Sequence, residues 1–142
     1  MAKVSIYLNF QGNTEEAFNF YKSVFKTEFI GSIFRMGDLP QEGMPPLSDE
    51  DKNKIMNIGL PILGGTVIMA TDMLESMGQK LFIGNNTTIN LEPDTKEEAD
   101  RIYGLLSQDS KECVAPHDEF WGYWGCCLDK FGIRWMFNVA NN

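Results

Sequence analysis

Residues 15–21 read EEAFNFY and residues 97–103 read EEADRIY, so the pattern Glu-Glu-Ala-x-x-x-Tyr occurs twice, displaced by 82 positions. Apolar residues follow each copy at helical spacing and lie on one face. A residue suited to cap a helix N-terminus precedes each copy, Asn13 in the first and Thr95 in the second, with glutamate three positions later. The repeat therefore predicts two amphipathic helices, each covering one face of a sheet.

Strand-like segments flank both predicted helices. Leu8–Phe10 before the first helix corresponds to Ile89–Leu91 before the second, and GTVIMA at 65–70 corresponds to GIRWMF at 132–137. β-branched and aromatic residues predict further strands over 28–36, 54–60, 66–71, 111–115, 123–128 and 133–139. The order in each half is strand, helix and three strands. We therefore predict an α+β fold in which tandem βαβββ modules, 1–78 and 79–142, form a curved mixed sheet around a cavity within one domain, 1–142.

The two halves differ in length at one segment. The helices match at an offset of 82 and the last strands at 67, so the first half carries 15 extra residues. The excess falls at 37–53, GDLPQEGMPPLSDEDKN, where three Pro and two Gly predict a mobile loop. We interpret its acidic run after Ser48 as a solvated stretch rather than a cation site.

Composition limits the classes of partner. The chain has 142 residues with a formal net charge of −8, and no Lys or Arg cluster offsets that charge locally. An acidic surface repels phosphate backbones and anionic lipid headgroups, so we expect neither nucleic acid nor membrane partners. No window holds about 18 uninterrupted apolar residues, and the N-terminal residues lack the pattern of a secretory leader. We expect a cytoplasmic protein.

Cysteine and histidine limit the chemistry. Cys126 and Cys127 are adjacent and Cys113 is separate, which matches neither a disulfide framework nor a CxxC motif, so we expect reduced thiols. His117 is the only histidine. Any histidine-rich metal site or Ser/His/Asp triad would have to be built around that one imidazole. His117 is either a general base supported by Asp118 or Glu119, or a histidine of a surface turn.

Three longer motifs resemble a known family. They are YLNFQGNTEEAFNFYKSVF at 7–25, KIMNIGLPILGGTVIMATD at 54–72 and DEFWGYWGCCLDKFGIRWMFN at 118–138. In this order they resemble the PhnB-like branch of the vicinal oxygen chelate superfamily, which includes the glyoxalase, bleomycin resistance and dioxygenase proteins. The resemblance covers nearly the whole chain. It implies the tandem βαβββ fold, frequent homodimerisation and a cup-shaped cavity used for metal-assisted chemistry or for ligand sequestration.

The superfamily's metal ligands do not match this sequence. Enzymes of the superfamily hold a metal ion through four His or Glu side chains, whose positions fall here near Ser5, Met69, Asn86 or Thr87, and Met136. None of these is a good ligand for a hard divalent ion. The branch commonly has His after Ile-Met on the third strand, where this chain has Asn57, an amide that cannot exchange protons near neutral pH. We therefore predict no metal and no other cofactor.

Some relatives carry a demethylubiquinone methyltransferase label. A nucleotide-like cofactor usually requires a glycine-rich turn from a strand into a helix, whereas Gly64 and Gly65 precede a predicted strand. The sequence therefore gives no support for that activity.

The candidate ligand-binding residues combine aromatic, thioether and polar side chains. Aromatic residues gather in the C-terminal third, and either line the cavity or fill the core or a dimer seam. Arg134 and Trp135 alternate along one predicted strand, so only one of them faces the cavity; Arg134 would suit a carboxylate or phosphonate, and we expect it to face solvent. We interpret Asp72 and Asp129 as turn residues, with Asp129 shaping the final hairpin. The candidates are Tyr7, Asn57, Met69, Trp121, Arg134, Trp135 and Met136.

These observations favour a metal-independent small-molecule-binding protein, and we expect a homodimer. Two alternatives stay open. The first is a metal-dependent lyase, isomerase or dioxygenase-like enzyme whose ligands lie at other positions. The second is a dimeric interaction module whose cavity is closed by its own aromatic side chains.

Overall fold

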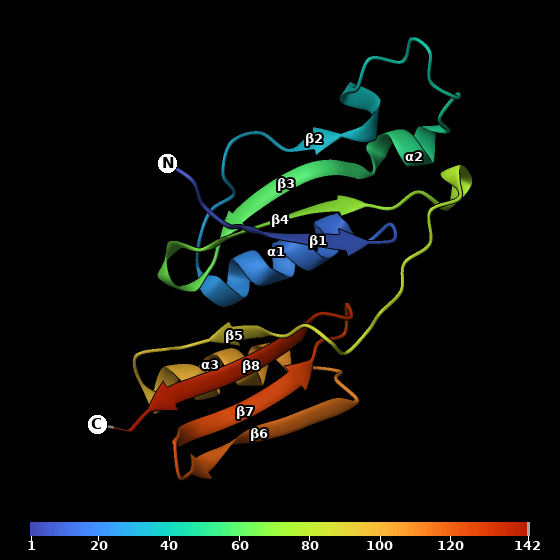
Figure 1. Cartoon of the computed structure of the whole chain (residues 1–142). Coiled ribbons are helices and arrows are strands. Elements are labelled where there is room, and N and C mark those ends of the chain that lie inside the picture. The colour runs from blue at the N-terminus through green and yellow to red at the C-terminus, as the bar shows by residue number, and fades with distance from the viewer. Residues whose placement is uncertain (142) are drawn as a thin grey trace. The chain divides into compact units, whose positions relative to one another are not determined.

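The computed structural model describes residues 1–141 and divides the chain into two compact units, Met1–Leu81 and Phe82–Asn142 (Figure 1). Each unit contains one four-stranded sheet. No helix among the described residues is long and apolar enough to cross a membrane.

The first unit follows the order strand, helix and three strands. Its main elements are β1 (Ile6–Phe10), α1 (Thr14–Phe25), β2 (Phe34–Arg35), β3 (Ile55–Pro61) and β4 (Val67–Asp72). The sheet order is β1-β4-β3-β2, with β1 parallel to β4 and the other pairs antiparallel. The helical crossover through α1 allows the parallel pairing, since parallel strands need a long connection. Short helical turns occupy the connections: η1 (Met36–Asp38), α2 (Asp49–Asn53), η2 (Leu63–Gly65) and η3 (Glu75–Met77).

The second unit repeats this topology. Its elements are β5 (Ile89–Leu91), α3 (Lys96–Leu106), β6 (Glu112–Glu119), β7 (Gly122–Leu128) and β8 (Arg134–Ala140). The sheet order is β5-β8-β7-β6, and β5 pairs in parallel with β8 as β1 does with β4. The predicted α+β fold of two βαβββ modules is therefore confirmed.

Each sheet has one face covered by its own helix (Figure 1). In the first unit, Phe10 of β1 and Phe18 of α1 meet edge to face with ring centroids 6.1 Å apart. In the second unit, Tyr103 of α3 meets Phe137 of β8 in the same manner at 5.7 Å. Ala17 and Ala99, the equivalent alanines of the repeat, are both fully buried because small side chains let the helices approach their sheets closely.

The two helices are capped differently at their N-termini. Thr95 accepts a hydrogen bond from the backbone N–H of Glu98, as the capping pattern predicts. Asn13 occupies the N-cap position of α1, but its side chain makes no capping bond. Instead the buried Asp72, at the end of β4, accepts bonds from the backbone N–H groups of Gly12 and Thr14. A residue remote in sequence thus satisfies the first backbone donor of the helix, which has no partner within the helix.

Several predicted elements differ from those observed. The segment 37–53 is not entirely loop, because Ser48 caps the short helix α2 by accepting a hydrogen bond from the Asp51 N–H. The strand predicted over 28–36 is reduced to Phe34–Arg35. Strand β6 runs to Glu119 rather than ending at residue 115. It continues past Pro116 because a shift in register lies between Val114 and His117.

The strand pairings also correct the internal alignment. Leu8 lies opposite Ala70 of β4, and Leu91 lies opposite Phe137 of β8. Because Ala70 and Phe137 are equivalent in the repeat, Leu91 corresponds to Leu8 and not to Phe10. The two polar loops before the helices differ in length by one residue, which hid this register in the sequence.

Candidate functional site

The face of each sheet opposite its helix carries the polar and half-exposed side chains. In β4, Ile68 and Ala70 are buried against the helix side, whereas Val67, Met69 and Thr71 are only half-buried. This alternation is expected when one face of a sheet is packed and the other is not. We call the second face of each unit its open face.

Three sequence-predicted residues lie together on the open face of the first unit. Tyr7 of β1 lies opposite Met69 of β4, which in turn lies opposite Gly59 of β3. The side-chain amide of Asn57 donates a hydrogen bond to the Tyr7 hydroxyl at 3.5 Å. Tyr7 is 48% exposed, so its phenol remains accessible to a ligand. The group provides one phenol, one amide and one thioether.

On the open face of the second unit, β8 contributes Arg134, Met136 and Asn138. Met136 lies opposite Asn90 of β5 on one side and Cys126 of β7 on the other. Asn138 donates a hydrogen bond to the side-chain carbonyl of Asn90 at 2.7 Å. Asn90 and Met136 occupy the positions that correspond to Tyr7 and Met69 in the first unit, and Asn138 corresponds to Thr71.

Arg134 is held rigidly by three hydrogen bonds. Its Nε donates to the backbone carbonyl of Gly84 at 2.8 Å, and its two terminal nitrogens donate to the Glu112 carboxylate at 2.8 and 3.3 Å. The guanidinium keeps the pKa of the Glu112 carboxyl below its usual range. An arginine has five N–H donors, so two remain beyond these three bonds.

Trp135 lies on the other side of the strand from Arg134. It is fully buried on the helix side of β8, and its indole N–H donates to the Asp129 carboxylate at 2.8 Å. Arg134 shares the open face with Met136, whereas the Trp135 ring packs in the core and the residue also lines the pocket described below. Asp129 also accepts from the backbone N–H groups of Phe131 and Ile133, which fits its predicted role in the final hairpin.

Aromatic side chains cover the end of the second open face near the β6–β7 turn. The indole N–H of Trp121 donates to the Asn138 side chain at 3.4 Å, and its ring lies 6.4 Å from that of Trp124. The imidazole of His117 meets Trp124 edge to face at 5.8 Å. Phe120 is 90% exposed and packs against Trp121.

His117 stands in strand β6 rather than in a surface turn. Its Nδ1 lies 3.0 Å from the carbonyl of Ala115, and its Nε2 lies 2.8 Å from the Glu119 carboxylate. The bonds to Ala115 and Glu119 raise the pKa of the imidazole above its ordinary value. The sequence prediction named Glu119 as one possible partner of this base, and the geometry brings the two together.

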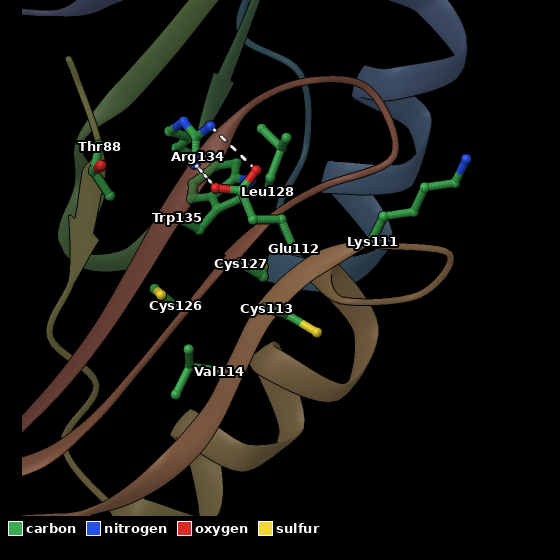
Figure 2. A pocket seen from close by; sticks show the side chains of 10 residues that line it. All are labelled: Thr88, Lys111, Glu112, Cys113, Val114, Cys126, Cys127, Leu128, Arg134 and Trp135. Atoms are coloured by element: carbon green, nitrogen blue, oxygen red, sulfur yellow. Dashed lines mark hydrogen bonds and ion pairs between the residues drawn. The ribbon is translucent and has the colours of Figure 1, made fainter. Parts of the chain in front are cut away.

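A pocket of about 380 Å³ opens in the second unit (Figure 2). Arg134 and Glu112 stand at one end of it, and Val114 lies toward the other. Its walls are formed by Thr88, Lys111, Glu112, Cys113, Val114, Cys126, Cys127, Leu128, Arg134 and Trp135. Of these, the sequence predicted Arg134 and Trp135 as ligand-binding candidates. The signal for Cys126 and Leu128 was their alternation along β7, which the sequence shows but which does not reveal which face is open.

The donor set at the superfamily's metal positions does not fit a hard divalent ion. The register places Tyr7 and Asn90 beside Met69 and Met136, instead of Ser5 and Asn86 or Thr87, which lie before the strands. Thioether, phenol and amide groups are weak ligands for such ions compared with imidazole and carboxylate. Among residues 1–141, no three His, Cys, Asp or Glu side chains form a group that could hold a metal ion.

Comparison with known proteins gives a consistent set of relatives. The sequence model of the family described as 3-demethylubiquinone-9 3-methyltransferase matches residues 2–137. Protein YjdN of Escherichia coli is 28% identical over 144 residues, covering 96% of this chain and 95% of that protein. The crystal structure of protein PA1353 from Pseudomonas aeruginosa is 27% identical with a TM-score of 0.82, and each chain is covered completely.

Two further structures extend the likeness. A Bacillus cereus structure described as a putative 3-demethylubiquinone-9 3-methyltransferase, PhnB protein, is 24% identical with a TM-score of 0.76, covering 98% of this chain and 100% of that one. A glyoxylase/bleomycin resistance protein/dioxygenase domain from Frankia is 9% identical with a TM-score of 0.66, covering 99% of each chain. At these identities the two structures show the fold alone, which is the glyoxalase-like fold.

Proposed function

The chain belongs to the PhnB-like family described as 3-demethylubiquinone-9 3-methyltransferase, within the glyoxalase/bleomycin resistance/dioxygenase superfamily, and we propose that it binds a small molecule without a metal ion. The site is the pocket of the second unit that Arg134 lines. The observation that carries this proposal is the rigid Arg134 at one end of a pocket whose volume, about 380 Å³, suits a small ligand.

The pocket wall divides into a polar end and an apolar side. Arg134 and Thr88 supply hydrogen-bond donors, and Val114, Cys126 and Leu128 supply apolar surface. Sites that bind small molecules commonly combine an apolar wall with a few fixed polar groups that orient the ligand. Because three hydrogen bonds already hold the guanidinium, little side-chain entropy is lost when a ligand binds to it.

The charge around Arg134 favours a neutral ligand. Glu112 engages both terminal nitrogens, so a carboxylate could bind them in a bidentate manner only by displacing Glu112. Lys111 also lines the pocket, but Figure 2 shows its side chain extending away from Arg134, and the formal net charge of −8 further disfavours anions. A carbonyl oxygen needs only one of the remaining N–H donors. We therefore assign the ligand to neutral, largely apolar carbonyl compounds such as ketones, esters or amides.

The glycine pair of the first unit supports binding over methyl transfer. Gly64 and Gly65 both have positive φ angles, 72° and 84°, and lie in the turn η2 between β3 and β4. A glycine-rich phosphate site would instead place such glycines between a strand and a helix N-terminus.

Thermal unfolding tests the proposal. The protein is purified without a histidine tag and dialysed against a chelator. A panel matched in size would include neutral ketones, carboxylic acids and hydrocarbons. We expect ketones to raise the melting temperature, since a ligand that binds only the native state stabilises it. Arg134→Met should abolish the shift, whereas Arg101→Met should retain it, because Arg101 forms its ion pair with Glu98 on α3.

Two results would overturn this function. One is a divalent ion that copurifies in stoichiometric amount and is required for the thermal shift, which would favour the metal-dependent enzyme. The other is a shift that survives Arg134→Met, which would place the ligand elsewhere.

We also propose that the protein is a homodimer that buries the aromatic turn after β6. Phe120 and Trp121 are 90% and 46% exposed, and adjacent exposed aromatic side chains are typical of association surfaces. Sedimentation equilibrium should give a dimer for the natural chain and a monomer for Phe120→Ser. A natural chain that stays monomeric at micromolar concentration would refute this.

A further inference from the structure

The strand register brings together two cysteines that are distant in sequence. Cys113 of β6 lies directly opposite Cys127 of β7, and the next pair along the ladder is Val114 with Cys126. Directly opposite residues of an antiparallel pair have Cβ atoms about 4.5 to 5.5 Å apart on the same face. Disulfides join Cα atoms about 4.4 to 6.8 Å apart, with Cβ atoms about 3.5 to 4.5 Å apart. Closing the pair therefore requires only a small approach of the two side chains.

The two thiols differ in accessibility. Cys113 is exposed, whereas Cys127 is 3% exposed and lies on the covered side of the sheet. Cys126 points to the opposite face, because neighbouring strand residues alternate. Figure 2 shows all three around one end of the sheet, with the side chain of Cys113 on the outer strand.

We propose that Cys113 and Cys127 are an oxidative modification site, at which a hydroperoxide converts the two thiols into a cross-strand disulfide. The exposed Cys113 reacts first: its sulfur attacks the peroxide, the O–O bond breaks, and a sulfenic acid and water (or an alcohol) form. The sulfur of Cys127 then attacks the sulfenic sulfur, loses its proton, and water leaves as the S–S bond forms. Two thiols are oxidised by two electrons and one peroxide is reduced.

Burial assigns the order of these steps. Cys113 is exposed and Cys127 is 3% exposed, so peroxide reaches Cys113 first; desolvation also raises the pKa of the Cys127 thiol to about 12, which makes it the less reactive of the two. Cys127 then acts as the resolving thiol, because it lies directly opposite the sulfenic acid and loses its proton as the S–S bond forms. This modification site does not depend on the proposed ligand, and its test requires none.

The experiment treats the full chain with a stoichiometric amount of hydrogen peroxide and then blocks free thiols with N-ethylmaleimide. Trypsin would leave all three cysteines in one peptide, since no Lys or Arg stands between Lys111 and Lys130. Chymotryptic cleavage after Trp121 and Trp124 separates Cys113 from the other two. Mass spectrometry should then find peptides joined by a disulfide, with a loss of about 2 Da from the intact protein.

Variants identify the pair. Cys126→Ser retains both proposed partners, so it should form the disulfide and leave no thiol to label. Cys113→Ser changes only an exposed side chain and should keep both remaining thiols free. In Cys127→Ala, verified as folded by circular dichroism, Cys113 should accumulate as a sulfenic acid that dimedone traps.

Three outcomes would overturn the proposal. If the natural chain forms a disulfide but Cys126→Ser does not, the partner of Cys113 is Cys126 and not Cys127. A disulfide that links two chains on a non-reducing gel would make the site intermolecular. Further oxidation of Cys113 to the sulfinic acid in the natural chain, without a disulfide, would show that Cys127 cannot reach it.

Discussion

The two units share a topology but differ in the chemistry of their open faces. On the covered side, each unit packs one helix, with its repeat alanine, against aromatic rings of the sheet. On the open side, the first unit presents Tyr7, Asn57 and Met69, whereas the second presents an ion pair, one thiol and tryptophan rings. Packing against the helix constrains volume and polarity on one face, and leaves the other free to diverge.

Each unit contains a buried aspartate, and the two aspartates stabilise different parts of the fold. Asp72 ends β4 and bonds the start of α1 and the backbone N–H of Ile55. Asp129 bonds the turn between β7 and β8 and the indole of Trp135. The first ties helix to sheet and the second shapes a hairpin. Units of the same topology thus reach the same layered structure through local bonds at different places.

The largest expected effect contrasts the two faces of the second sheet. Trp135→Ala should lower the free energy of unfolding by about 3 to 5 kcal/mol, because it opens a cavity in the covered face. It also leaves Asp129 without its indole partner. Trp124→Ala, on the open face, should cost about 1 kcal/mol. Urea unfolding measures both, and equal losses would show that the two faces are packed alike.

The next effect contrasts the two aspartates. Asp72→Asn puts an amide N–H against a buried backbone donor, that of Ile55 or of Thr14, and should cost about 1 to 3 kcal/mol. Asp129→Asn should cost a similar amount. Hydrogen exchange distinguishes them: the first variant should lose protection at the start of α1, and the second at the β7–β8 turn. Loss of protection in both units from either variant would show that they unfold as one cooperative structure.

A smaller effect concerns the extra segment of the first unit. Replacing residues 40–46 with Gly-Ser should change the free energy of unfolding by less than about 1 kcal/mol, since loop length has a weak effect on closure entropy. Residues 48–53 must stay, because Asp51 accepts a hydrogen bond from Ser76 and pairs with Lys54. Chemical denaturation measures the change. A loss well above this value would show that the segment packs on the unit.

The smallest effect is the pH dependence that the one histidine gives to the second unit. The pKa of His117 is raised above 6.5, chiefly by the Ala115 carbonyl and then by Glu119. Protonated His117 therefore favours the folded state, and this stabilisation is complete below 6.5 and is lost as the pH rises through the folded pKa.

The measurement is an NMR titration of the one imidazole in the chain. Its midpoint should lie above 6.5, and Glu119→Gln should lower it while Glu92→Gln, outside β6, leaves it unchanged. A midpoint at or below 6.5 in the natural chain would contradict the hydrogen bonds seen at His117.

The sequence predicts the framework well because repeated helices and alternating strands carry strong local signals. The EEAFNFY and EEADRIY segments place both helices within a residue or two of their observed positions. Pro116 misled the prediction of β6, since proline usually ends a strand, and only the tertiary register shows how a bulge accommodates it.

The candidate site is less predictable, because whether a strand side chain reaches the site depends on which face of the sheet the helix covers. Alternation shows that Arg134 and Trp135 face opposite sides, yet it cannot say which side is open. The sequence also does not predict the role of Glu112. Its hydrogen bond to Arg134 spans 22 positions, and no local sequence pattern indicates it. Tyr7, Asn57 and Met69 were named from the family resemblance or from side-chain chemistry, and the fold brings them onto one surface.

The register shift in β6 has a consequence for self-assembly. This strand is an edge strand of its sheet. An uninterrupted edge strand is a template on which further chains can pair and form fibrils. Pro116 offers no N–H there, and Gly125 lets the kinked backbone approach closely, since a Cβ at that position would lie 2.7 Å from the Pro116 nitrogen. These two residues thereby hinder polymerisation through β6, the longest strand of the second unit and an edge of its sheet.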